Sequence, residues 1–214
     1  VKQMNNPYQE FDQFLELAEN ENLTFVFSNT TEAGIVFDTK DQFTDKPPRS
    51  FPGKLTRLLH HRYKTFNGDP SKVLHIIPSE LIEQNGTKLK KIILELSKIW
   101  KLEDHFISWI NQNHFYNTLV DRIVPGFPKK DLDFYKKELS FDDQLIVTCE
   151  PFFLWVIEGN PELLKIFPTD QLKEIDVKVV PDLGIFRTRK VRILNGSHTT
   201  MVPVGLLHGT KTVS

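Results

Sequence analysis

The stretch Leu23-Thr24-Phe25-Val26-Phe27-Ser28-Asn29-Thr30-Thr31-Glu32-Ala33-Gly34 decides the fold class of this chain. Its first half is a short run rich in β-branched and aromatic residues, and its second half is polar and turn-like. Before it, apolar residues from Phe11 to Ala18 recur at helical spacing, so residues 8–19 predict an amphipathic helix. The order helix, strand, polar loop is one step of an α/β layer, in which loops beyond the carboxyl ends of strands hold ligands.

The alternation of helices and strands continues along most of the chain. Strands or strand-like runs are predicted over residues 73–77, 119–124, 145–149, 152–157 and 177–180, and helices over residues 51–66, 89–100 and 106–110. From about Gly184 the pattern changes to a helix that reaches Met201, with Pro203 ending or kinking it. We therefore predict a mixed α/β part over residues 1–182 and the start of a helical part over residues 183–214.

Composition limits the function. The chain has 214 residues, of which 39% are hydrophobic and 26% charged, which is typical of a globular protein. Twenty-seven basic and 28 acidic residues give a net charge of −1, so a nucleic-acid partner is not expected. No run approaches the ~18 apolar residues of a membrane span, and the first residues are not signal-like. We expect no membrane partner and a cytoplasmic location. The single cysteine, Cys149, cannot form an intramolecular disulfide or a cysteine-based metal site.

Several nucleotide-binding motifs are missing. The ten glycines are never two residues apart, so neither G-x-G-x-x-G nor a Walker A loop is present. If a nucleotide binds, its pyrophosphate-binding turn must lie outside this chain. The chain starts at Val1 with a helix that follows no strand, and it ends soon after a strong helical pattern. We therefore expect it to be the middle portion of a longer protein.

The segment from Arg187 to His198 is the most informative for chemistry. With about 100° per residue on an α-helix, Asn195 lies about 140° and His198 about 80° from Lys190, on one broad face. Arg187 falls one turn earlier on the same face. A basic solvated helix face with a capping Asn-Gly is the ordinary interpretation. The alternative is a lysine base beside an amide and an imidazole, which can remove a hydroxyl proton and stabilise an alkoxide without a metal.

This segment resembles a known family. Lys190-x4-Asn195-x2-His198 is similar to the signature of the long-chain mannitol dehydrogenase family, and KVRILNGSHTTMVPVG (residues 190–205) is most similar to its tagaturonate reductase (altronate oxidoreductase) branch. Other blocks agree in the same order: SNTTEAGI (28–35), SFPGKLT (50–56), PSELIEQNG (78–86), NTLVDRIVPG (117–126) and EPFFLWVIEG (150–159).

The resemblance implies a fold and a cofactor. Residues 1–182 would be the C-terminal part of a Rossmann-like NAD-binding domain, and residues 183–214 the start of an all-helical substrate domain. Hydride would pass directly between the substrate and NAD, so no metal would be required.

The resemblance also implies roles for individual residues. Lys190 would be the general acid/base, and Asn195 and Asn117 would hydrogen-bond the reacting oxygen. His198 would help hold the substrate hydroxyls. Thr31 and Glu32 would lie near the nicotinamide, with simple loop capping as the alternative for both.

Some departures from the family pattern bear on the substrate. The glycine-rich turn and the acidic residue that reads the NAD ribose should precede Val1, and further basic substrate-binding residues should follow Ser214. In mannitol-oxidising relatives a carboxylate stands three residues before the lysine, where this chain has Arg187. A guanidinium pairs with a carboxylate in a bidentate way, so Arg187 could face the carboxylate of a hexuronate.

The expected activity is the NAD-dependent reduction of D-tagaturonate to D-altronate and its reverse, with a small sugar acid as the binding partner. The alternatives are a fructuronate reductase or a mannitol 2-dehydrogenase of the same family, or a non-catalytic module. The isolated chain is expected to be inactive.

Overall fold

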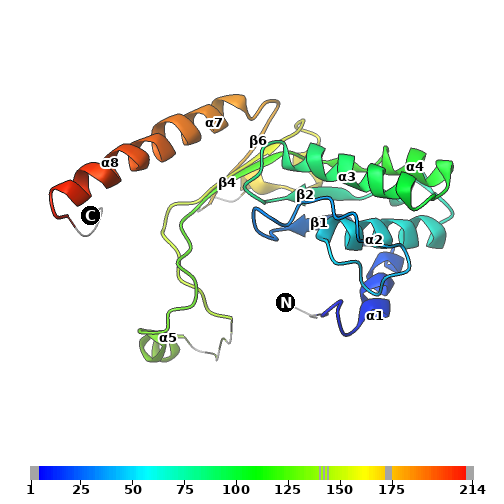
Figure 1. The fold of residues 1–214 in the computed structure, drawn as a ribbon, viewed down its shortest axis with the longest axis horizontal. Helices are drawn as coiled ribbons and strands as arrows, with labels where there is room; N and C mark the ends of the chain where they lie inside the picture. Colours follow the sequence, from blue (N-terminus) through cyan, green and yellow to red (C-terminus); the bar gives the residue numbers. More distant parts are fainter. Residues whose placement is uncertain (1–4, 140, 142, 144, 172–174, 211–214) are drawn as a thin grey trace.

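A computed structural model describes residues 5–139, 141, 143, 145–171 and 175–210. In chain order its main elements are α1 (Phe11–Glu16), β1 (Phe25–Ser28), α2 (Phe51–Thr65), β2 (His75–Pro78), α3 (Asn85–Ile99), α4 (Asp104–Ile110), β3 (His114–Phe115), β4 (Thr118–Asp121), α5 (Leu132–Glu138), β5 (Leu154–Glu158), α6 (Leu163–Ile166), β6 (Asp176–Val180), α7 (Gly184–Arg189), a π-helical segment (Lys190–Asn195) and α8 (Gly196–Leu207). Figure 1 shows a helix-covered sheet from which two parts project. One is the long helix α7–α8, and the other is an arm formed by the described residues between β4 and β5, in which two coil segments lead to and from α5.

Strands β1, β2 and β3 form a parallel sheet in that order. Helices α2 and α3 pack on each other and against this sheet, because each carries apolar residues at spacings of three and four that are buried. Ser50 caps α2 by accepting a hydrogen bond from the amide of Gly53, and Pro52 occupies the first turn. The buried core lies between these helices and the central strand, where Ile76 is fully buried.

Strands β4, β5 and β6 form a second sheet that follows directly from the first. β4 is antiparallel to β5, and β5 is parallel to β6. The two sheets meet at Tyr116 and Asn117: the Tyr116 amide donates to Ile76 O of β2, and the Asn117 carbonyl accepts from Glu158 N of β5. This junction places the carboxyl ends of β1 and β2 beside β4.

The long C-terminal helix differs in two ways from its prediction. It continues past Met201 and Pro203 to Leu207. Proline removes one backbone hydrogen bond, but the residues around it are exposed, so water can reach the freed carbonyl. In addition, the segment Lys190–Asn195 is a π-helix, so the rotation of about 100° per residue expected for an α-helix does not hold there.

The predicted strand over residues 145–149 is wrong. That segment belongs to the arm, where the described residues form a single isolated bridge, between Gly126 and Thr148. Leu145 and Val147 are 66% and 58% exposed, and Cys149 is exposed as well. Two extended segments without a packed apolar face are at most marginally stable as a sheet, so apolar alternation alone does not make this segment a strand. The arm carries helix α5, which the sequence did not predict.

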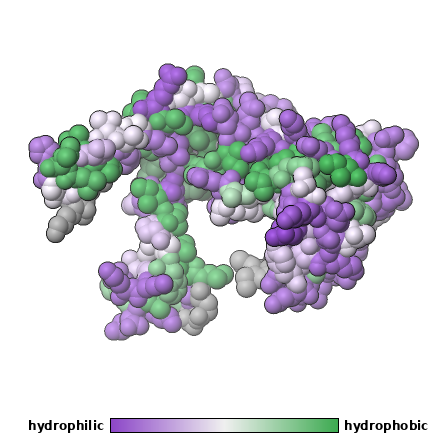
Figure 2. Space-filling model, viewed as in Figure 1, coloured by the Kyte–Doolittle hydropathy of each residue, from purple (hydrophilic) through white to green (hydrophobic). Residues whose placement is uncertain are grey.

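Exposed apolar side chains concentrate on the arm and on the long helix, as the green areas of Figure 2 show. Leu206 and Leu207 of α8 are 69% and 88% exposed, and Phe134 of α5 is 61% exposed. Among the described residues, no helix is long and apolar enough to cross a membrane. The predicted α/β class is confirmed: helices alternate with two sheets, and a long helix follows the second sheet.

Candidate active site

One face of β4 is covered by the start of the long helix. Side chains alternate along a strand, so Asn117, Leu119 and Asp121 share a face. Asn117 and Leu119 line a cavity of about 150 Å³ together with Leu183 and Arg187 of the helix. Further along, Lys190 Nζ lies 3.6 Å from Asp121 Oδ1. The structure therefore brings three of the predicted residues, Asn117, Arg187 and Lys190, to the same side of one strand.

Lys190 stands at the first position of the π-helical segment, with 13% of its side chain exposed. Hydrogen bonds in a π-helix join residues five apart, so Asn195 lies one π turn beyond Lys190. Because a π turn is wider than an α turn, the angle between the two residues around the helix axis is smaller than the 140° expected for an α-helix. Single π turns occur frequently at functional sites.

Asn195 and His198 lie further from the cavity. Neither lines that cavity: Asn195 is exposed and His198 is partly buried, with His198 Nδ1 2.8 Å from Leu194 O. Among the described residues, the side chain of Asn117 bonds to Thr87 and Glu158, and no hydrogen bond joins it to Asn195 or His198. The structure thus groups Lys190 with Asn117 by way of β4, and places Asn195 and His198 further along the same helix.

Asn117 is held from both sides. Its Nδ2 donates to Glu158 Oε2 at 2.7 Å, and its Oδ1 accepts from Thr87 N at 3.0 Å and from Thr87 Oγ1 at 3.2 Å. Thr87 lies in the first turn of α3, whose unpaired amides carry partial positive charge. The amide oxygen of Asn117 therefore faces α3, and its nitrogen faces Glu158 of β5.

Arg187 has an ion-pair partner on a loop. Its Nη2 lies 3.0 Å from Glu83 Oε2, with 39% and 68% of the two side chains exposed. Exposed pairs of this kind contribute about 0–1 kcal/mol, so an incoming carboxylate can replace Glu83 at small cost. Arg187 keeps access to the cavity while paired.

Thr31 and Glu32 lie in the loop after β1, and both are exposed. Thr31 has a positive φ of 82°, a conformation that is strained for a β-branched residue. Gly34 closes the loop by donating to Thr31 O, and a Cβ at Gly34 would collide with Thr30 Oγ1. The loop is therefore a fixed feature at the carboxyl end of β1.

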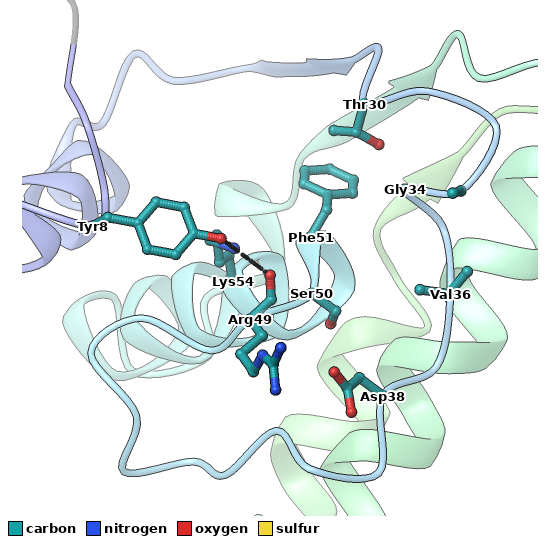
Figure 3. Close-up of a pocket in the computed structure, with 10 residues that line it drawn as sticks. Tyr8, Thr30, Gly34, Val36, Asp38, Arg49, Ser50, Phe51 and Lys54 are labelled. Atoms are coloured by element: carbon teal, nitrogen blue, oxygen red, sulfur yellow. Dashed lines mark hydrogen bonds between the residues drawn. The ribbon is translucent and has the colours of Figure 1, made fainter.

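Two clefts flank this loop. One, of about 610 Å³, is largely apolar and is lined by Phe27, Ser28, Asn29, Ser79, Val120, Arg122, Val124, Phe153 and Trp155. The other, of about 680 Å³, lies between the loop and the start of α2 (Figure 3). There Lys54 Nζ donates to Tyr8 Oη at 3.0 Å and to Arg49 O at 2.7 Å.

Two buried polar residues, to which sequence analysis gave no role, connect the loop after β1, the end of β2 and the start of β4 by hydrogen bonds. Glu80, 2% exposed, accepts from Ser28 Oγ and from the amide and hydroxyl of Thr30. Asn85, fully buried, accepts from Thr118 N at 2.9 Å and donates to Pro78 O at 3.1 Å. Both lie in the block at residues 78–86 that resembles the family, and the polar residues of that block are the sequence feature that could have pointed to them. Among the described residues, no group of three or more metal-ligating side chains is found.

Comparison with known proteins identifies the family of this chain. The model of the "Mannitol dehydrogenase Rossmann domain" matches residues 1–166. The chain is 50% identical over 207 residues to an altronate oxidoreductase from Bacillus subtilis (strain 168), 50% over 209 residues to one from Phocaeicola vulgatus, and 44% over 209 residues to one from Yersinia enterocolitica. These alignments cover 96–97% of this chain but 43% of each relative, so the chain spans less than half the length of these relatives.

Solved structures of the same fold are more distant in sequence. A Pseudomonas fluorescens mannitol 2-dehydrogenase, described as a ternary complex with NAD and D-mannitol, superposes with a TM-score of 0.71 at 23% identity. The superposition covers 98% of this chain and 44% of that one. A substrate-free D-sorbitol dehydrogenase gives a TM-score of 0.67 at 22% identity.

Proposed function

The chain belongs to the mannitol dehydrogenase family, and from that premise we propose that it is part of an NAD-dependent altronate oxidoreductase that interconverts D-tagaturonate and D-altronate. One observation carries the proposal: Lys190 and Arg187 face the Asn117 side of β4 from a single helix. A proton carrier, an amide donor and a second cation are the groups that a keto acid needs for metal-free reduction. The 50% identity to altronate oxidoreductases supports this substrate class.

The cofactor fits the apolar cleft beside the loop after β1. In open α/β sheets ligands bind beyond the carboxyl ends of the strands, and this cleft is lined there by Ser28, Asn29 and Ser79. Its wall of Phe27 and Trp155 suits a flat heteroaromatic ring. When bound, NAD supplies or accepts the hydride. Thr31 and Glu32 would stand at the edge of the nicotinamide end, on the loop that Glu80 holds in place through Thr30.

Lys190 moves the proton. In the reducing direction its ammonium group gives a proton to the substrate oxygen as that oxygen gains negative charge. In the oxidising direction its amine takes the hydroxyl proton. Asp121, 16% exposed, keeps the ammonium group paired in a largely buried place.

Two amides stabilise the developing alkoxide. Asn117 has a second N–H on Nδ2 that Glu158 does not use, and this N–H can point at the reacting oxygen. Asn195, one π turn beyond Lys190, supplies the other amide. His198, in the first turn of α8, binds the more distant hydroxyls.

Arg187 recognises the acid. In place of Glu83, its guanidinium pairs with the substrate carboxylate, which selects a hexuronate over a neutral ketose.

The residues proposed to bind the substrate from the helical side all lie in α7 or beyond it. We therefore place the boundary between the nucleotide-binding part and the helical substrate-binding part between residues 182 and 183, just before α7.

The direct test is NADH oxidation by the full-length protein that carries this chain, with tagaturonate, fructuronate and fructose as substrates. We expect the highest kcat/KM with tagaturonate and the lowest with fructose. A preference for fructuronate or fructose would reassign the substrate within the family, and no turnover with any of the three would discard the enzyme function.

A further inference from the structure

The carboxylate of Glu158, at the end of β5, links two separate parts of the candidate site. Its Oε2 accepts from Asn117 Nδ2 at 2.7 Å, and its Oε1 accepts from Leu183 N at 3.3 Å. Leu183 is the N-cap residue of α7, and its carbonyl accepts the first helical bond, from Arg187 N. A single side chain therefore joins the asparagine beside β4 to the start of the helix that carries Lys190.

The opposite side of Asn117 is equally constrained. Thr87 donates twice to Asn117 Oδ1, from its amide and from its hydroxyl. The first turn of α3 can come this close because residue 86 is glycine: a Cβ there would lie 2.2 Å from Tyr116 O. Thr87 thus takes the oxygen of the amide and Glu158 takes its nitrogen, which leaves one orientation of the amide and one unused N–H.

We propose that Glu158 is a positioning residue: it fixes the direction in which Asn117 presents its free N–H and sets the distance between that N–H and Lys190 through α7. This inference rests on the proposed function, because it assigns to Asn117 a hydrogen bond to the reacting oxygen. Glu158 lines the same cavity as Asn117 and Arg187, and in this proposal it acts through its bonds to Asn117 and Leu183 rather than on the reacting oxygen.

A carboxylate suits this role better than the isosteric amide. Both oxygens of Glu158 accept, so it can receive the Asn117 amide and the Leu183 amide at once. The side chain of glutamine has one acceptor and one donor. In Glu158→Gln one of the two bonds is lost, or two donors face each other, while the shape of the side chain is nearly unchanged.

The test is a double-mutant cycle in the full-length protein, with NADH oxidation as the assay. Glu158→Gln alone should lower kcat by about 10-fold or more, the effect of losing a hydrogen bond to a charged group, with a smaller change in KM. In an Asn117→Ala background the same change should lower kcat by less than about 2-fold, because its target is gone. Equal factors in both backgrounds would overturn the proposal. The control is Glu162→Gln, since Glu162 is 69% exposed and pairs only with Lys165 among the described residues.

A second measurement does not depend on turnover. Hydrogen exchange at Leu183 and in the first turn of α7 should be faster by about 10-fold in Glu158→Ala than in the Glu162→Ala control, because the Leu183 amide loses its acceptor. Unchanged exchange would overturn the link to α7. If Asn117→Ala retains full activity while this exchange does increase, the proposed function fails and the link stands.

Discussion

Lys190 Nζ lies 3.6 Å from Asp121 Oδ1, and the two side chains are only 13% and 16% exposed. The carboxylate beside this lysine therefore comes from β4, whereas the helix position three residues earlier is occupied by Arg187. Because both partners are largely buried, removing either one leaves the other charge poorly compensated. The pair connects the long helix to the second sheet at the point where the π-helical segment begins.

Lys190→Met should abolish most of the activity and also destabilise the protein. Loss of a general acid/base typically lowers kcat by about 10²- to 10⁴-fold. The unpaired Asp121 should lower the free energy of unfolding by up to about 3 kcal/mol. Adding Asp121→Asn should restore most of the stability but none of the activity. NADH oxidation and urea unfolding measure the two effects.

Lys165→Met is the matched control for this variant, because Lys165 is 71% exposed and forms a surface pair with Glu162. It should leave both quantities unchanged. Should Lys190→Met keep its activity, or should the double variant regain it, Lys190 is not the proton carrier.

Arg187→Ala should raise KM for tagaturonate by about 10- to 100-fold, the loss of a charge-assisted pair, and change KM for fructose far less. Arg189→Ala is the control on the same helix, since its guanidinium lies over the ring of Phe186, 5.4 Å from the centroid. Steady-state kinetics with both substrates would decide. Equal effects on the acid and the ketose would contradict a carboxylate-binding role for Arg187.

Much of the fold could be predicted because its signals are local. Helices α2 and α4 lie where the apolar spacing placed them, and α3 begins four residues earlier than predicted, at Asn85. β3 was missed because it is two residues long and is defined only by its neighbour β2. The strand over residues 145–149 was predicted from alternation, but strand formation needs a partner sheet that the sequence alone does not reveal.

The candidate site was predicted only in part for a similar reason. The residue types around Lys190 could be read along one helix, and the family resemblance added Asn117. Asp121, Glu83 and Glu158 are partners across elements, at separations in sequence that no periodicity links. The π turn was also unforeseen, because an α-helical wheel assumes the hydrogen bonding that this segment departs from.

Gly86→Ala should destabilise the protein by about 1–3 kcal/mol and lower the activity. The new Cβ would lie 2.2 Å from Tyr116 O and 3.1 Å from Asn117 N, so backbone atoms must move. Because α3 and Asn117 separate, the Thr87 bonds to the amide weaken. Gly205→Ala is the control: its nearest atom would be 3.7 Å away, and alanine favours a helix by up to about 1 kcal/mol. Thermal unfolding that ranks the two variants in the opposite order would refute the close approach of α3 to Asn117.

His75→Phe should flatten the pH dependence of stability between pH 7 and pH 5. Burial, with a smaller contribution from the neighbouring His114, lowers the pKa of His75 from 6.5 to about 4. The unfolded chain therefore takes up a proton that the folded chain does not, so stability is lost as the pH falls through 6.5 towards 4. Solvent screens this partly exposed side chain, so we expect His75 to lower the free energy of unfolding by about 1 kcal/mol between pH 7 and pH 5.

Other titrating groups also make stability depend on pH, and the choice of pH and variant separates their contributions from that of His75. Burial also lowers the pKa of His60, which acts in the same direction and remains in the variant. The pKa of Glu103 is lowered to about 2, chiefly by its hydrogen bond with Lys64, so its contribution is lost only below about pH 4.5. Urea unfolding at pH 7 and pH 5 should therefore give a smaller difference for His75→Phe than for the wild type. The control is His105→Phe, at an exposed position, which should show the same difference between pH 7 and pH 5 as the wild type. An unchanged difference in His75→Phe would mean that His75 takes up its proton equally in the folded and unfolded chains.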